Sequence, residues 1–250
     1  MRNKGIILFA TLLFLCGLAV LLYPVIKTAG FQTRERETIR QFEQYRSASK
    51  THLPSDDTNE IPAEKERSFP ELWNACIEYN ETLRKTHQAG FTARSMGLPP
   101  LDLTEYGWDN EVFATLSIPT ADIEAPIYLG ASDYNLYRGA AILGQTSMPI
   151  GGENTHCVIA GHRTWNGIMH PFLGLQQVEV GDLVYITNPW ETLTYRVVDV
   201  KIIYPDDTEG IRIRNGQDLV SVFTCTYPST QRVLVTCERT NKEVENGPNH

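Results

Sequence analysis

An uninterrupted run of uncharged residues near the N-terminus constrains this chain more than any other feature. It extends from Gly5 to Ile26, and its 22 residues are enough to cross a hydrocarbon core of roughly 30 Å as a helix. A secretory signal peptide has a shorter apolar region, about 7–15 residues, followed by a small-residue cleavage site. The segment YPVIKTAGF offers no convincing site of that kind. We therefore expect residues 1–30 to form an uncleaved transmembrane anchor.

The charges that flank this run do not decide the orientation of the anchor. Arg2 and Lys4 precede the run and favour a cytoplasmic N-terminus, but Lys27 and arginines at 34, 36 and 40 follow it. The sequence contains no second apolar run of this length. The rest of the chain is therefore expected to be soluble structure tethered by its N-terminus.

Composition indicates a folded protein and argues against nucleic acid as a partner. Hydrophobic residues make up 42% of the chain and charged residues 21%, as in globular domains. The net charge is −8 and the pI is near 5.3, so no basic excess is available for phosphate groups. The five cysteines contain no CxxC pair, and the sequence leaves open whether any two form a disulfide.

The segments on either side of the main domain are polar or helical. Residues 31–68 are expected to form a charged helical stalk followed by a polar linker that contains two prolines. Residues 69–110 are expected to form an N-terminal helical, lid-like region, and residues 241–250 a polar tail. The helix at its start has one apolar face, whose residues recur mostly at spacings of three or four: Phe69, Leu72, Trp73, Cys76, Ile77 and Leu83.

Residues 111–240 have the pattern of a β domain. In TLTYRVVDV, for example, Leu193, Tyr195 and Val197 can face inward while the residues between them face outward. Seven or eight such short strands predict a mainly β fold, a closed or nearly closed antiparallel-rich barrel. The β-branched and aromatic runs, separated by turn residues, are EVFATLSIP, ADIEAPIYLG, THCVIAGH, GDLVYIT, TLTYRVVDVKIIYP, LVSVFTC and RVLVTCE.

Three polar residues stand where predicted strands begin or end. His162 follows one strand, Cys225 ends another, and Arg232 opens the last. Strand ends on one rim of a barrel can converge although they are far apart in sequence. A thiolate is a strong nucleophile, a histidine can move its proton, and an arginine can hold a carbonyl or an oxyanion. Together the three residues predict acyl transfer through a thioester.

Each of the three also has a simpler structural explanation, as a buried thiol, a hydrogen-bonded histidine or a solvated arginine. The histidines at 156, 162 and 170 are spaced by six and eight residues, which matches no usual ligand pattern, so no metal site is expected. Cys157 and Cys237 lie inside strand runs and are expected in the core.

GGENTHCVIAGHR, with its histidine 63 residues before the cysteine of FTCTYPSTQR, resembles the sortase family of membrane-anchored cysteine transpeptidases. The similarity covers roughly Glu111 to Arg239. IYPDDTEGIRIRNGQDLVSVFTC resembles the segment before the cysteine in the pilin-polymerising class C group. The resemblance implies an eight-stranded β-barrel with N-terminal helices and catalytic His162, Cys225 and Arg232. It also implies cleavage of an LPxTG-like signal between Thr and Gly, followed by acyl transfer to an amine.

The resemblance also implies partners and a location. The donors would be secreted proteins with LPxTG-like C-terminal sorting signals, and the acceptor a pilin lysine, as in pilus assembly. The chain would sit in a Gram-positive-type cell membrane with its catalytic domain on the extracellular face, and no cofactor is implied. Three alternatives stay open: transfer to a peptidoglycan amine, a barrel that binds sorting signals without turnover, and a papain-like hydrolase. The last is disfavoured because there the cysteine precedes the histidine.

The sequence departs from the family pattern in three places. The strand before the cysteine is Ser-Val-Phe-Thr-Cys in place of Thr-Leu-x-Thr-Cys, which keeps Thr224 as a candidate substrate contact. The loop TYPSTQ between Cys225 and Arg232 is about two residues shorter than is usual in the pilin group. The Asp-Pro-aromatic lid and the C-terminal span common in that group are not found; Asp102 and Trp108 are the candidates for a lid.

Overall fold

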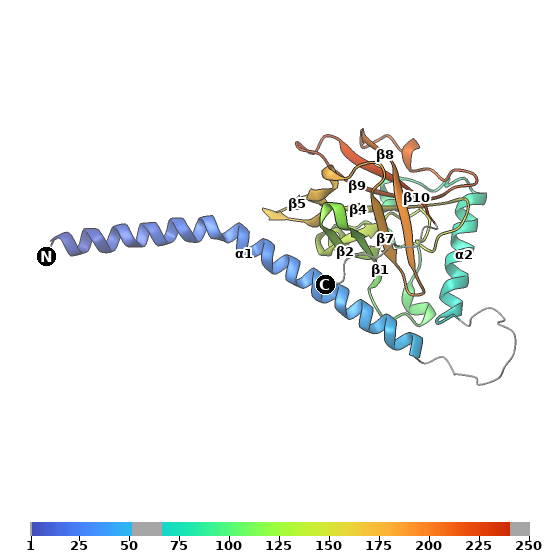
Figure 1. The fold of residues 1–250 in the computed structure, drawn as a ribbon, viewed down its shortest axis with the longest axis horizontal. Coiled ribbons are helices and arrows are strands. Elements are labelled where there is room, and N and C mark those ends of the chain that lie inside the picture. Colours follow the sequence, from blue (N-terminus) through green and yellow to red (C-terminus); the bar gives the residue numbers. More distant parts are fainter. Residues whose placement is uncertain (1, 52–66, 241–250) are drawn as a thin grey trace.

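Eight strands close into a β-barrel in the computed structural model, which describes residues 2–51 and 67–240 (Figure 1). Their order around the barrel is β1-β2-β3-β4-β9-β10-β8-β7. Neighbouring strands are antiparallel except for the parallel pairs β2–β3 and β4–β9. The strands are β1 Val112–Ile118, β2 Ile123–Leu129, β3 Ala140–Ile142, β4 Thr155–Gly161, β7 Leu183–Thr187, β8 Thr192–Ile203, β9 Asp218–Cys225 and β10 Arg232–Arg239.

The alternating runs form the predicted strands, and the predicted inward residues are confirmed. Leu193, Tyr195 and Val197 of β8 are buried, while the residues between them are partly exposed. β3 was not predicted, since its three residues are all buried and too few to show an alternating pattern. A small two-stranded sheet, β5 Thr164–Trp165 with β6 Ile168–Met169, stands outside the barrel.

A single long helix, α1 (Arg2–Thr51), contains both the expected anchor and the expected stalk. It is the one helix in the described part of the chain that is long and apolar enough to cross a membrane. Figure 1 shows its N-terminal half projecting away from the barrel and its second half running beside the barrel. Pro24 lies inside the helix, where it lacks the N–H that would bond to the preceding turn. Most of the predicted linker, residues 52–66, and the tail, residues 241–250, lie outside the described residues.

The helix predicted from Phe69 is α2 (Pro70–Lys85), with Pro70 in its first turn. Leu72, Cys76 and Leu83 are buried, but Ile77 is 41% exposed, so its predicted place on the apolar face is wrong. The fourth buried position is Asn80. Its side-chain amide accepts a hydrogen bond from the Met148 backbone N–H over 2.7 Å and donates one to the Met148 carbonyl over 3.4 Å. The buried stripe therefore follows positions 72, 76, 80 and 83, which is narrower than the sequence indicates.

Short helical turns connect these larger elements. They are α3 Ala93–Met96, α4 Asp133–Arg138, and the 3₁₀ turns η1 Leu103–Tyr106, η2 Pro119–Ala121, η3 Pro171–Gln177 and η4 Glu209–Ile211.

A buried histidine, His156 of β4, lies on the outer face of the barrel beneath the segment that follows η4. His156 Nδ1 is 2.8 Å from the carbonyl of Arg212, which can only accept, so Nδ1 carries the proton. Its Nε2 then accepts from Ser221 Oγ, also at 2.8 Å. Burial disfavours the imidazolium and lowers the pKa of His156 from 6.5 to about 4. His156 is therefore neutral in the folded protein at pH 7.

This buried imidazole predicts sensitivity of the fold to acid. Because the pKa of His156 is lower in the folded than in the unfolded protein, its contribution to stability is fully present above pH 6.5. That contribution is lost as the pH falls toward 4. We expect the free energy of unfolding to drop by about 3 kcal/mol over that interval from this group alone. Urea unfolding of the full chain in detergent, followed by tryptophan fluorescence, measures the drop. His156→Gln is expected to lose less stability on acidification, and an equal loss would contradict the assignment.

Candidate active site

The ends of three neighbouring strands meet at one rim of the barrel. β4 and β9 run parallel, so Gly161 and Cys225 end them at the same edge. β10 is antiparallel to β9 and begins there with Arg232, which pairs directly with Cys225. Directly opposed residues of antiparallel strands share one face, with Cβ atoms about 5 Å apart. The side chains of Cys225 and Arg232 therefore project from the same face of the sheet, next to each other.

His162 is the first residue beyond β4, and the parallel register brings it to the same place. Ala160 pairs with Phe223, so the next two positions along the strands bring His162 level with Cys225. Thr224 fixes this alignment, because its buried hydroxyl donates to the carbonyl of Gly161 over 2.7 Å. The hydroxyl thus links the two strand ends, and its role as a substrate contact stays a prediction.

The His162 ring is held between other rings. Trp165 stacks on it, with ring centroids 4.5 Å apart and planes 18° apart, and His170 meets it edge-on at 6.0 Å. Burial lowers the pKa of His162 below its usual value, and the charge of Asp133 opposes that shift. An imidazole that is neutral at pH 7 is able to accept a proton from a nearby thiol.

Arg232 is tied to the loop that joins β9 to β10. Its guanidinium donates from one nitrogen to the carbonyls of Ser229 and Gln231, at 3.2 and 3.0 Å. An arginine has five N–H donors in a planar fork, so donors remain for a substrate oxygen. On the other side of the rim, the Arg163 guanidinium lies 5.7 Å from the centre of the Tyr227 ring. This contact connects the same loop with the segment after β4.

Sequence reasoning missed the β5–β6 hairpin that carries Trp165. Asn166 and Gly167 form its turn, and both have positive φ. An Asn-Gly pair is a strong hairpin signal, and it was visible in HRTWNG. The hairpin folds back after His162 and explains how a residue outside the barrel ladder is held in place.

The two candidate lid residues make other contacts. Trp108 is buried, and its ring packs against Phe42 of α1 at 6.1 Å. Asp102 caps the turn η1 by accepting from the Thr104 backbone N–H at 3.0 Å. These contacts serve local packing and give no support to a lid, which stays a prediction.

All five cysteines are free, but they differ in access. Cys157 and Cys237 are buried in the core, as predicted, and so is Cys76. Burial raises the pKa of Cys76 to about 12 and raises those of the other two as well. Cys225 is half-buried, and Cys16 lies exposed on the apolar half of α1. Of the cysteines in the barrel and α2, Cys225 is the accessible one.

Selective alkylation tests this difference. In a Cys16→Ala background at pH 7.5, iodoacetamide is expected to modify Cys225 at least about 100-fold faster than the buried thiols, which are rarely ionised. Peptide mapping of the folded chain after brief labelling measures the rates. Comparable labelling of Cys157 or Cys237 would contradict the burial that the structure assigns to them.

A closed β-barrel with cysteine, histidine and arginine at adjoining strand ends defines a class of proteins suited to acyl transfer. Comparison with protein families matches residues 116–240 to the sortase domain. The chain belongs to the sortase family. Sortases are cysteine transpeptidases. The family therefore agrees with the acyl-transfer chemistry that the residues at the barrel rim indicate.

Curated relatives match over part of their length. Sortase A of Streptococcus agalactiae is 28% identical over 131 residues, which cover 51% of this chain and 52% of the relative. Sortase D of Bacillus subtilis is 29% identical over 113 residues, covering 45% and 53%. The matched region thus spans little more than half the length of these curated relatives.

Solved structures match over more of their length. Sortase C1 of GBS Pilus Island 1 is 30% identical with a TM-score of 0.62, covering 70% of this chain and 90% of that one. A mutant form of sortase C-1 from S. pneumoniae is 26% identical with a TM-score of 0.65, covering 82% and 100%. These similarities confirm the predicted sortase-type barrel.

Proposed function

We propose that this chain is a membrane-anchored transpeptidase that cleaves an LPxTG-like sorting signal through a thioester on Cys225. The observation that carries the proposal is the direct pairing of Cys225 with Arg232 in the strand register, with His162 level beside them. A thiol, a base and a fixed cation on one rim have the chemistry that acyl transfer needs.

The roles follow from residue type and position. His162 takes the proton of the Cys225 thiol, and the thiolate attacks the threonine carbonyl of the signal. Arg232 donates hydrogen bonds to the oxyanion that forms. His162 then protonates the leaving glycine amine, which leaves an acyl thioester on the enzyme. Attack by an incoming amine releases the joined product and the free thiol.

The acceptor that we propose is a lysine side chain of a pilin subunit, which makes the reaction a polymerisation. Support comes from the similar structures, one of which is a sortase C1 of a pilus island and another the Streptococcus pneumoniae sortase C, an enzyme with pilin substrate specificity. The long apolar helix α1 supports an anchored enzyme. We propose that the barrel lies on the extracellular side, because that is where secreted donors emerge.

A transfer assay separates this function from its alternatives. The full chain in detergent is mixed with a sorting-signal peptide and two competing acceptors, a lysine-containing pilin-type peptide and a peptidoglycan-type amine. Mass spectrometry of the products is expected to find the isopeptide to lysine, with none from a Cys225→Ala control. A product on the peptidoglycan-type amine alone would indicate a wall-anchoring sortase. Binding without any product would indicate a non-catalytic barrel.

A further inference from the structure

The anchor helix packs directly against the segment that follows His162. The Phe31 ring of α1 lies with its centroid 4.2 Å from that of His170. Three residues earlier, Thr28 Oγ1 accepts a hydrogen bond from the Met169 backbone N–H over 3.4 Å. Thr28, Phe31 and His170 are each less than 10% exposed. The contact is therefore a packed interface between α1 and the end of the β5–β6 hairpin.

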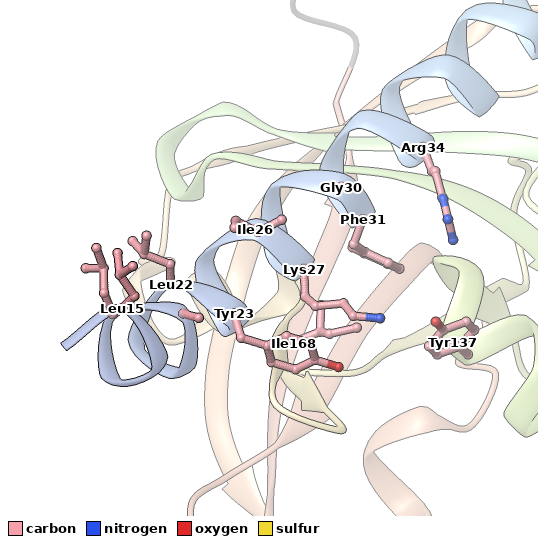
Figure 2. Close-up of a pocket in the computed structure, with 12 residues that line it drawn as sticks. Leu15, Leu22, Tyr23, Ile26, Lys27, Gly30, Phe31, Arg34, Tyr137 and Ile168 are labelled. Carbon is pink, nitrogen blue, oxygen red and sulfur yellow. The ribbon is translucent and has the colours of Figure 1, made fainter. Parts of the chain in front are cut away.

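Figure 2 shows the α1 side of this interface. Lys27, Phe31 and Arg34 project from α1 on the side where Tyr137 and Ile168 lie. Together they line a groove of about 540 Å³ that continues along the apolar half of the helix. The Phe31 ring is 6.3 Å from the Tyr137 ring, so it is held by α4 as well as by His170. The helix is thus seated in the surface of the barrel domain near residue 31.

His170 passes this packing on to His162. Its ring meets the His162 ring edge-on, with centroids 6.0 Å apart, while Trp165 covers a face of His162. The His170 backbone N–H also donates to the carbonyl of Arg163 over 3.1 Å, which closes the hairpin onto the residue next to His162. Phe31, His170 and His162 therefore form a continuous row of ring contacts from the anchor helix to the rim.

We propose that Phe31 and His170 are positioning residues for His162, so that docking of the anchor helix sets the geometry of the active site. His162 lies beyond the end of β4, and the barrel ladder does not fix its side chain. A side chain in such a place depends on the packing around it for its orientation. This inference rests on the catalytic role proposed for His162.

Each element that packs near His162 contributes charged or titratable groups. Asp133 faces it from α4, and Cys225 and Arg232 lie beside it on β9 and β10. Arg163 and His170 flank the β5–β6 hairpin. Lys27 and Arg34 of α1 line the adjoining groove. Burial lowers the pKa of His162. If the α1 contact loosens and water enters, that pKa rises toward its usual value.

Matched substitutions on the same helix test the proposal in the full chain in detergent. Phe31→Ala removes the ring next to His170, whereas Phe42→Ala removes another buried α1 ring, which packs against Trp108 instead. We expect Phe31→Ala to lower kcat for a sorting-signal peptide about tenfold with KM nearly unchanged, because the base is misplaced. Phe42→Ala is expected to stay within about twofold of the wild-type kcat, since its contacts lie elsewhere.

Titration of the His162 ring by NMR provides a readout that does not need turnover. We expect its midpoint to rise in Phe31→Ala and to match the wild type in Phe42→Ala. Phe31→Leu keeps apolar volume without the ring and gives a milder test if Phe31→Ala does not fold. An unchanged midpoint in the folded Phe31 variants would overturn the proposal. If the wild type turns over no sorting peptide, the proposed function fails, and the NMR comparison still decides the coupling.

Discussion

Replacing His162 by alanine is expected to slow thioester formation by about 10²- to 10⁴-fold, which is the range of general acid–base catalysis. The side chain lies beyond the end of β4, so its loss leaves the β4–β9 pairing and the Thr224–Gly161 hydrogen bond in place. Without it, the thiol loses the imidazole that lies level with Cys225 and takes its proton. Rapid-quench mass spectrometry of the full chain with excess sorting-signal peptide measures the acylation rate.

Two controls separate the chemistry from a general effect of losing a histidine. His87→Asn alters an exposed histidine in a left-handed turn that asparagine tolerates, and it is expected to keep the wild-type rate. Added imidazole is expected to restore part of the activity of His162→Ala, because the small base can occupy the vacated space. A His162→Ala protein that retained more than about a tenth of the wild-type rate would exclude His162 as the base.

The second large effect is expected at Arg232. Arg232→Ala is expected to lower kcat by about 10²- to 10³-fold, as when a donor to an oxyanion is removed. Arg232→Lys keeps the charge but loses the planar fork and is expected to lose about tenfold. Because the guanidinium also bonds loop carbonyls at 229 and 231, the lysine variant separates loss of charge from loss of bracing. Steady-state kinetics with a fluorogenic sorting-signal peptide measures both.

Arg214→Ala is the matched control for this series. Arg214 is exposed on the loop before β9, at the end of the strand remote from Cys225, and its removal is expected to leave kcat unchanged. An Arg232→Ala protein with normal kcat and a raised KM would show that Arg232 binds the substrate without stabilising the transition state.

The barrel was largely predictable because its longer strands carry their own patterns. β8 and β10 show their buried positions in the sequence, and their bounds agree with the predicted runs within two residues. β3 has three residues, all buried, and its place depends on pairing with β2 and β4 rather than on local sequence. Likewise, the exposure of Ile77 depends on which stripe of α2 the barrel covers.

Only part of the arrangement at the barrel rim was predictable from the sequence. Cys225 and Arg232 flank a short loop between two strand runs, so a hairpin pairing already follows from the sequence. The surroundings of His162 were not predictable, because Trp165 reaches it through a hairpin and Phe31 approaches from a helix about 130 residues earlier. Long-range docking of this kind leaves no local periodicity. The lid proposed for Asp102 and Trp108 drew on family likeness, and their contacts do not support it.

Intact mass spectrometry of the full chain with an LPxTG-containing peptide is the first measurement to make, because it detects nucleophilic attack by Cys225 itself. We expect an adduct with the mass of the acyl fragment, mapped to Cys225 and released by hydroxylamine. The adduct is expected to be absent in Cys225→Ala and retained in Cys16→Ala, which removes the exposed thiol of α1. An adduct that persists in Cys225→Ala, or none with several sorting-motif peptides although Cys225 alkylates readily, would contradict nucleophilic attack by Cys225.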